Sequence, residues 1–276
     1  MPVEQKSAEI LVVGNELLNG TTLDTNSFWL TEQLNKAGIM IERKTTIRDS
    51  LNVISISFRE ALTRKPNWLF SIGGLGPTFD DMTIQGLSNG VHRQMELDPV
   101  AISMLRQSYR RRGRPYRRLS KASLKMAAIP KGALPLLNSV GSAPGVLVEE
   151  GQTRIVALPG VPEEMKQIFL SQVLDSVKES SGYSSIERWI KITGLPESRL
   201  APEVTRLFRM HKRYLYVKSH PSGFQRGRPV LNIQIILVSP STDLVRRTKT
   251  LDQISNALTE YARKLGAGVS RVRLVR

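Results

Sequence analysis

The first 170 residues alternate between short strand-like segments and amphipathic stretches. Residues 26–37 and 53–63 carry apolar positions at helical spacing, and Gly38 follows the first of them as a natural C′ residue. Strand patterns lie before, between and after these helices, at residues 10–13, 39–46 and 68–72. Repeated strand–helix–strand units imply a mostly parallel sheet with right-handed crossovers and helices on both faces. The pattern therefore predicts a three-layer α/β/α domain.

Further short strands and a helix complete this domain, at residues 133–137, 145–148, 154–158 and 162–169. The polar stretch at residues 178–185 is typical of a linker. Beyond it the order changes to strand, helix, strand, strand and long helix, at residues 188–193, 197–210, 214–218, 230–238 and 243–265. We expect a larger domain over residues 8–175 and a smaller α+β domain over residues 186–276.

Composition limits the chemistry that the chain can carry. The 276 residues contain no cysteine, which excludes disulfides, thiolate nucleophiles and sulfur-ligated metals. The three histidines are scattered, so a bound metal is expected to be a hard cation held by oxygen atoms. The N-terminus lacks the apolar core of a signal peptide, and no apolar run approaches the roughly 20 residues that cross a membrane. We expect a cytoplasmic protein with no membrane partner.

The segment at residues 71–83, SIGGLGPTFDDMT, combines a glycine-rich turn with two carboxylates directly after a strand. Gly73, Gly74 and Gly76 let the backbone turn sharply and approach a ligand, and a following helix start favours phosphate. Asp80 and Asp81 would repel phosphate unless a divalent cation lies between them. The segment therefore predicts metal-assisted phosphate chemistry.

Several of these acidic residues also have a structural explanation. Thr78 and Asp81 have capping-box spacing, so Asp81 can pair with backbone N–H groups at a helix start. If the helix begins at Asp80, that residue and Thr83 share a face. Acids in the first turn of the helix after Pro162, Glu163 and Glu164, complement the helix dipole, and the glycine and asparagine residues of segment 138–145 can be turn residues. After the first strand, Glu16 and Asp24 can bind ribose hydroxyls or cap a helix.

The chain has 40 Lys and Arg against 24 Asp and Glu, a formal net charge of +16. Much of the charge lies in residues 106–125, which fit a solvated helical face broken near Gly113. A second interpretation places Arg117, Arg118, Lys121 or Lys125 over a diphosphate. Nucleic-acid binding is the third. We expect nucleic acid not to be a partner, because the smaller domain lacks the GXXG loop by which KH domains clamp nucleic acid.

Five motifs stand in the order and spacing of one known family: GNELLNG, DTNS, GGLGPTFDDMT, KMAAIPKGALPLLNSVGSAPG and LPGVPEEM, within residues 14–165. On these motifs the chain resembles the CinA family, the competence/damage-inducible protein A group. Asn15 stands where many bacterial members carry threonine, and in this the chain is more similar to the archaeal form of the family. The N-terminal domain of that family is similar to the molybdopterin-binding fold, and the tail from about residue 186 resembles its KH-like domain. Bacterial members often add a nicotinamide mononucleotide deamidase domain, for which the residues up to Arg276 leave no room, so we do not expect that activity.

The resemblance implies divalent-metal-dependent hydrolysis of a nucleoside-diphosphate linkage, as in an ADP-ribose pyrophosphatase. Two alternatives are a molybdopterin-binding or adenylylating protein of molybdenum-cofactor biosynthesis and a nucleic-acid-binding module. The implied cofactor is a divalent cation such as Mg²⁺, with K⁺ as a second candidate ion, and the implied partners are a small nucleotide substrate and a second copy of the chain in a homodimer.

The catalytic candidates are Asp80 and Asp81, which would hold the metal, and Lys125, which would stabilise charge on the departing phosphate. The general base is not identified, and Glu16, Glu163 and Glu164 are candidates. The residues expected to bind nucleotide or phosphate are Gly14, Glu16, Asp24, Asn26, Gly73, Gly74, Gly76, Thr78, Thr83, Asn138, Gly141, Pro144, Gly145, Gly160, Pro162 and Glu163.

Overall fold

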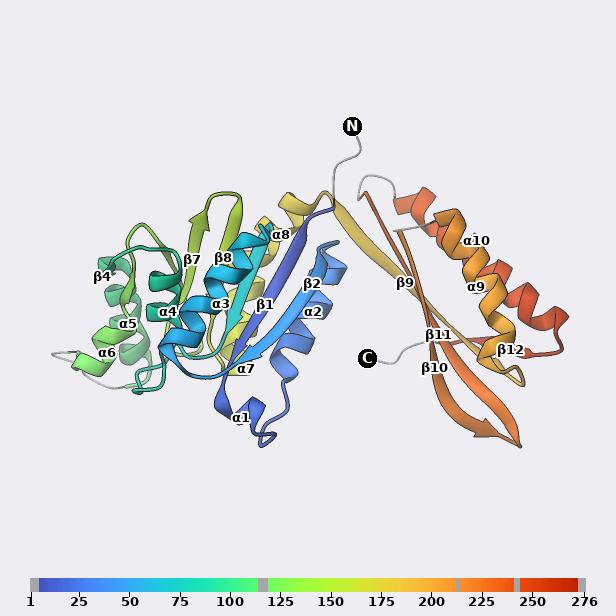
Figure 1. Ribbon diagram of the computed structural model, residues 1–276, viewed down its shortest axis with the longest axis horizontal. Helices are drawn as coiled ribbons and strands as arrows, with labels where there is room; N and C mark the ends of the chain where they lie inside the picture. Colours follow the sequence, from blue (N-terminus) through green and yellow to red (C-terminus); the bar gives the residue numbers. More distant parts are fainter. Residues whose placement is uncertain (1–4, 114–118, 212–213, 241–243, 273–276) are drawn as a thin grey trace. The chain divides into compact units, whose positions relative to one another are not determined.

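The computed structural model describes residues 5–113, 119–211, 214–240 and 244–272. The chain forms two compact units, Met1–Ser181 and Gly182–Arg276, called here the first and second unit (Figure 1). Within the described residues, no helix has both the length and the apolar character needed to cross a bilayer.

The first unit is built on a six-stranded sheet in the order β2-β1-β3-β8-β7-β6. Its strands are β1 (Ser7–Val13), β2 (Met40–Ile47), β3 (Trp68–Ile72), β6 (Leu134–Leu136), β7 (Gly145–Glu150) and β8 (Thr153–Leu158). The pairs β1–β2, β1–β3 and β3–β8 are parallel, whereas β7 runs antiparallel to both β8 and β6. The expected mostly parallel sheet is confirmed, with an antiparallel edge that strand patterns alone did not indicate.

Helices cover both faces of this sheet. They are α1 (Asn15–Leu18), α2 (Thr25–Lys36), α3 (Leu51–Thr63), α4 (Thr83–Gly90), α5 (Pro99–Arg111), α6 (Lys121–Lys125), α7 (Pro162–Ile168) and α8 (Leu174–Ser181), with a π-helical turn at Phe169–Val173 between the last two. A small antiparallel pair, β4 (Met95–Leu97) and β5 (Ala128–Pro130), lies apart from the main sheet in the strand pairing.

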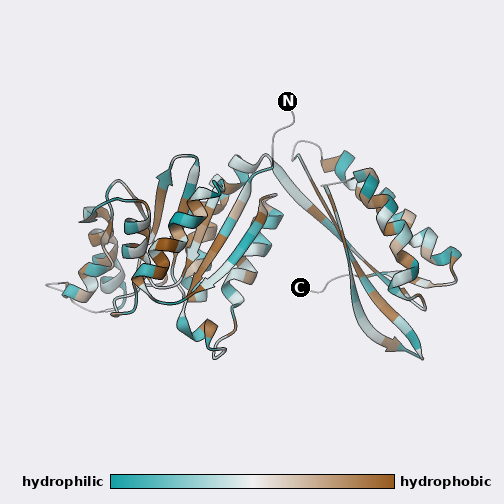
Figure 2. Cartoon of the chain, viewed as in Figure 1, coloured by the Kyte–Doolittle hydropathy of each residue, from teal (hydrophilic) through white to brown (hydrophobic). Residues whose placement is uncertain are grey.

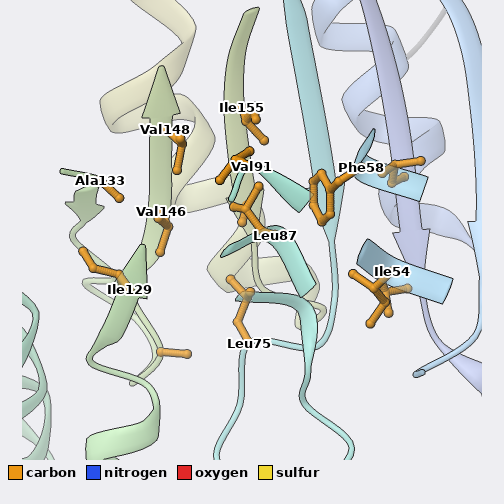
Figure 3. Packing of buried hydrophobic residues seen from close by; sticks show 14 of the residues in the cluster. Ile54, Phe58, Leu75, Leu87, Val91, Ile129, Ala133, Val146, Val148 and Ile155 are labelled. Carbon is orange, nitrogen blue, oxygen red and sulfur yellow. The ribbon is translucent and has the colours of Figure 1, made fainter. Parts of the chain in front are cut away.

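Alternate residues of each buried strand belong to two apolar clusters. Leu11 and Val13 of β1 join one cluster with Ile54 and Phe58 of α3, and Figure 3 labels the two α3 residues. The alternating residues Ile10 and Val12 of β1 join a second cluster with Leu34 of α2 and with buried residues of α7 and α8. Because successive side chains of a strand point to opposite faces, two separate clusters mean two covered faces. The predicted three-layer α/β/α architecture is confirmed.

Two local predictions for the first unit are wrong, and a third falls on residues that the structure does not describe. The helix after the glycine-rich loop begins at Thr83, so Asp80 and Asp81 lie in a turn before it and Asp80 does not share a helix face with Thr83. The stretch 178–185 is not a linker, because α8 continues to Ser181 and the next strand begins at Tyr183. Arg117 and Arg118 lie outside the described residues.

The second unit is a four-stranded antiparallel sheet in the order β10-β11-β9-β12, with two helices. Its elements are β9 (Tyr183–Thr193), α9 (Glu197–His211), β10 (Leu215–Gln225), β11 (Arg228–Pro240), α10 (Leu244–Lys264) and β12 (Gly268–Arg271). Buried residues of β9, such as Ile190 and Ile192, form one core with Leu207 of α9 and Leu258 of α10. Both helices therefore pack on one face of the sheet, and hydrophilic and hydrophobic residues are mixed along α10 (Figure 2).

The predicted smaller α+β domain is confirmed, and β12 is an additional strand that the sequence pattern did not reveal. The buried Arg247 of α10 ties the helix to the sheet, because its guanidinium donates to Ser184 of β9 and to the Ser239 hydroxyl of β11. Burial lowers the pKa of this arginine from its ordinary value, and its hydrogen bonds compensate for the lost hydration.

Candidate functional site

A cleft of about 290 Å³ lies at the carboxyl ends of β1 and β3. Its lining includes Gly14 and Glu16 from the loop after β1 and Gly73, Gly74 and Thr78 from the loop after β3. Ligands of open α/β sheets collect at this edge. The loops after β1 and β3 therefore share one cleft.

The glycine-rich loop is packed so closely that side chains are excluded from it. Gly73 has φ +100° and Gly74 has φ +69°, both in the left-handed region. A Cβ atom on Gly73 would lie 2.3 Å from the Val13 carbonyl oxygen, and one on Gly74 would lie 2.2 Å from Oγ1 of Thr83. Thr83 is fully buried below the loop, and its hydroxyl has no hydrogen-bond partner among the described residues. The predicted ligand residue Thr83 is therefore a packing residue under Gly74.

The backbone amide groups of the glycine-rich loop are the groups through which it can bind a ligand. The N–H of Gly73 donates to the Leu158 carbonyl at 2.9 Å, and the Gly74 carbonyl accepts from the Thr83 N–H at 3.1 Å. The next three N–H groups, those of Gly74, Leu75 and Gly76, donate to no acceptor in the described part of the chain. Successive unpaired amides in a tight turn form a concave anion-binding surface. The loop can therefore bind a phosphate through its backbone.

A short turn holds the two predicted metal ligands. The Thr78 hydroxyl contacts Oδ1 of Asp80 and Oδ2 of Asp81, and the Thr78 N–H donates to Asp81 Oδ2 at 2.8 Å. The hydrogen bond from Thr78 lowers the pKa of Asp80, and the positive charge of Lys125 lowers it further. The ammonium of Lys125 donates to the Thr78 carbonyl oxygen. Asp81 therefore binds a backbone N–H as its capping interpretation required, but in a turn that precedes the helix.

Further carboxylates make this cleft acidic. Asp49 follows β2 and accepts the Asn15 N–H at 2.7 Å. Burial raises the pKa of Asp49, and the negative charges of Glu16 and Asp80 raise it further, against the lowering effect of the Asn15 bond. The carboxylates that line the cleft are Glu16, Asp24, Asp49, Asp80 and Asp81. A phosphate in this place needs a cation to offset their charge.

The donor set fits a cation that is shared with a ligand. Within the described residues, no group of three or more His, Cys, Asp or Glu side chains is placed to hold a metal alone. Mg²⁺ commonly binds through one or two carboxylates together with substrate phosphates and water. Asp80 and Asp81, joined through the hydroxyl of Thr78, offer two such carboxylates beside the amides of Gly74 to Gly76. The residues therefore suit a cation that completes its coordination with phosphate.

A second lobe of about 530 Å³ continues the cleft on the other side of the loop. Glu16, Gly74, Asp81 and Gly160 line both lobes, so the glycine-rich loop and one aspartate lie where the lobes meet. The second lobe is also lined by side chains from α5, from the loop before β7 and from α7, namely Tyr109, Arg112, Ser142 and Glu164. A ligand with a phosphate at its centre and a group at each end would fill both lobes.

Arg112, the residue after α5, brings a positive charge to this second lobe. Its guanidinium donates to the Ser142 hydroxyl at 2.8 Å and to the Val140 carbonyl at 3.1 Å. These bonds hold the guanidinium against the loop before β7. Sequence reasoning assigned no site role to Arg112, because it lies in a run of arginines that also fits a solvated helix.

The predicted residues of the loop before β7 shape that loop. The buried Asn138 donates to the Ala143 carbonyl at 2.8 Å and to Glu164 Oε2 at 2.6 Å, and it accepts the Gly141 N–H at 2.5 Å. A Cβ atom on Gly141 would lie 1.9 Å from the carboxyl carbon of Glu164, so that carboxylate covers the glycine. Pro144 and Gly145 are buried. None of these four predicted residues is in the lining of either lobe, and the loop instead positions Ser142 and Glu164.

The remaining predicted residues, apart from Glu163, either cap a helix or line one of the two lobes of the cleft. Asp24 lines the first lobe but also caps α2, where its carboxylate accepts the Ser27 N–H at 2.9 Å. Asn26 donates to the Gly160 carbonyl at 2.6 Å, and its buried Oδ1 has no hydrogen-bond partner in the described structure. Pro162 lines the first lobe, whereas Glu163 is exposed and its neighbour Glu164 faces the second lobe.

Asp49 is a site residue that the sequence reasoning missed. It follows a predicted strand at the carboxyl edge of the sheet, where ligands of such sheets collect, so this rule could have found it. Arg112 had no comparable signal, since its place in the cleft depends on how α5 packs against a distant loop.

Comparisons with known proteins support this fold and its family. A family model for the probable molybdopterin binding domain matches residues 9–179. A protein of Sulfolobus acidocaldarius is 34% identical over 98% of this chain and 100% of its own length, and one of Aeropyrum pernix is 36% identical over 97% of each. The solved structure of the protein CinA, of unknown function, from Thermoplasma acidophilum is 35% identical with a TM-score of 0.57, covering 62% of this chain and 99% of that one. The chain therefore belongs to the family of probable molybdopterin binding domains, with the CinA-like character that its motifs predicted.

Proposed function

We propose that the two-lobed cleft of the first unit binds a phosphate-bearing ligand of the molybdopterin type together with a divalent cation. The observation that carries this proposal is the row of unpaired N–H groups at Gly74, Leu75 and Gly76 within the described residues, of which Gly74 lines both lobes and the other two line the second lobe. The match to the probable molybdopterin binding domain favours a pterin phosphate as the first ligand to test.

Each part of the cleft has a distinct role in this proposal. The loop amides bind phosphate oxygens, and Asp80 with Asp81 would hold the cation, which would neutralise phosphate charge and polarise its P–O bonds when bound. Arg112 offers a charged donor to the part of the ligand in the second lobe. The Thr78 turn keeps both aspartates beside the loop, and Lys125 fixes that turn through the Thr78 carbonyl oxygen.

The test is calorimetric titration of the whole chain with molybdopterin under anaerobic conditions, with Mg²⁺ and with a chelator. We expect binding that requires Mg²⁺ and that Asp80→Asn or Asp81→Asn weakens, because each change removes charge with little change in volume. Asp175→Asn is the matched control, since Asp175 is an exposed carboxylate on α8. Equal binding with chelator, or equal loss in the control, would contradict the proposed cation site.

A second candidate is the hydrolysis of a nucleoside-diphosphate linkage, with ADP-ribose as the test substrate. It is favoured by the shared lining of the lobes, because a diphosphate at Gly74 and Asp81 would leave one lobe for each end of the molecule. Water would add across the P–O–P linkage, one P–O bond would break, and AMP and ribose 5-phosphate would form. Glu16 lines both lobes and is the candidate to accept the proton of that water.

Chromatographic detection of AMP from ADP-ribose, with and without Mg²⁺, separates the two candidates. Release of AMP in proportion to enzyme would establish hydrolysis if Asp80→Asn or Asp81→Asn lowered its rate by about a hundredfold or more. Binding of molybdopterin without any release of AMP would support the first proposal alone.

A further inference from the structure

Most of the net positive charge of the protein lies in its smaller unit. Residues 182–276 contain 18 Lys and Arg against 6 Asp and Glu, a formal charge of +12 out of the total of +16. The cleft that we assign to a small ligand lies in the other unit, and its first lobe is lined by carboxylates. The function proposed above uses none of the charged residues of the second unit. A small domain with this charge is strongly attractive to a polyanion.

One face of the second-unit sheet is left open by the two helices. The α9 and α10 helices pack on the face that carries Ile190, Ile233 and Ile235, and Figure 1 shows both helices on the same side of the strands. Side chains alternate along each strand, so the neighbours of these residues point to the opposite face. Strand register places Trp189 of β9 beside Gln234 of β11, and Gln234 beside Lys218 of β10.

Aromatic, amide and basic side chains meet on this open face. The half-buried Trp189 lies against the exposed His220 ring with centroids 5.1 Å apart, and the indole Nε1 is buried without a hydrogen-bond partner within the described residues. Tyr216, two residues before Lys218 on β10, is 53% exposed. By the same register, the face also includes Lys191, Arg228, Asn232 and the carboxylate residue Glu187.

We infer that this open sheet face, defined by Trp189, Lys191, Tyr216, Lys218 and His220, binds single-stranded nucleic acid. Exposed aromatic rings on a sheet give bases a surface on which to stack, and flanking lysines pair with the phosphates between them. The bases of a duplex are already stacked in pairs, so they cannot use such rings. This mode needs no GXXG loop, whose absence argued against nucleic acid at the level of the sequence.

The test is fluorescence anisotropy of the whole chain with labelled 15-nucleotide single strands of RNA and of DNA and with the corresponding duplexes, over 50–200 mM KCl. We expect at least one single strand to bind more tightly than its duplex, with affinity falling as salt rises. Tyr216→Ala should weaken that binding by roughly fivefold to a hundredfold, as loss of one stacked base does, without changing the salt dependence. Tyr216→Phe keeps the ring and should retain the affinity.

The chain offers a matched control for each contact. Phe208 on α9 is 54% exposed, and Phe208→Ala should change binding by less than about twofold, because its ring lies on the helical side. Lys218→Gln should lower the salt slope by about 0.7, whereas Lys249→Gln on α10 should leave it unchanged. Absence of binding at 50 mM KCl, duplex bound as tightly as single strand, or equal losses in Tyr216→Ala and Phe208→Ala would each overturn the inference.

Discussion

Replacement of Gly74 by alanine tests whether the glycine-rich loop is constrained by packing as well as by its backbone angle. The residue has φ +69°, at which an L-side chain destabilises by about 1–2 kcal/mol, partly offset by about 0.4–1 kcal/mol from the stiffer unfolded chain. The new Cβ would also lie 2.2 Å from Oγ1 of the fully buried Thr83, and overpacking of this kind costs about 1–3 kcal/mol. We expect Gly74→Ala to lower the free energy of unfolding by roughly 2–4 kcal/mol.

Two further variants separate the angle from the overlap. Gly151 has φ +57° with nothing within 4 Å of an added Cβ, so Gly151→Ala should show only the effect of the angle. Thr83→Ala removes the overlapping Oγ1 atom, and the Thr83 hydroxyl has no hydrogen bond to lose among the described residues. Thr83→Ala should therefore restore about 1–3 kcal/mol of the free energy of unfolding in the Gly74→Ala variant, but none in the Gly151→Ala variant. Urea unfolding followed by tryptophan fluorescence measures all of these. A Gly74→Ala variant no less stable than Gly151→Ala, or one without coupling to Thr83, would refute the reasoning.

Three further predictions concern charges of the first unit. Arg64 donates two hydrogen bonds, of 2.6 and 2.7 Å, to Glu9, which is 1% exposed. Arg64→Met should therefore lower the free energy of unfolding in urea by about 3–5 kcal/mol, because it leaves a buried carboxylate unpaired. Adding Glu9→Met to the same chain should recover most of that loss. Because the pKa of Asp49 is raised in the folded state, its protonation stabilises the fold at acidic pH, and that contribution is lost as pH rises from 3.8 through the raised pKa. Asp49→Asn keeps an acceptor for the Asn15 N–H, so its unfolding free energy relative to the wild type should increase over that pH range; a constant difference would contradict the cause assigned to the shift. Arg112→Gln should weaken binding of a ligand that fills the second lobe by roughly tenfold to a hundredfold in calorimetry, through loss of a charged hydrogen bond, while Arg110→Gln, exposed on α5, should not.

Sequence patterns predicted those parts of the fold that follow from local periodicity. The strand at residues 68–72 has the predicted limits, and α2 ends before Gly38, whose φ of +81° explains the glycine. The antiparallel direction of β7 was not predictable, because periodicity indicates burial and carries no information about strand direction. The stretch 178–185 was mistaken for a linker because its serines are polar, yet Ser181 is buried in the structure.

The candidate site was predictable where strand ends and glycines determine it. Loops at the carboxyl ends of β1 and β3 had to lie close together once the strands were paired, and the three glycines marked the close approach. The roles of individual side chains depended on contacts across long sequence distances. Asn138 resembled a ligand residue, but its amide is used by Ala143 and Glu164, and Arg112 resembled a solvated charge, but it lies against Ser142. Sequence spacing does not indicate such contacts.

The distribution of charge connects the two proposals. The first lobe of the cleft carries five carboxylates, so an anionic ligand gains affinity there only with a cation, even though the protein is strongly basic overall. A ligand of the cleft should therefore depend on divalent cations, and a polyanion on the open sheet face should depend on monovalent salt. Chelation and added KCl thus act on different sites, and a chelator that released both ligands would contradict their separation.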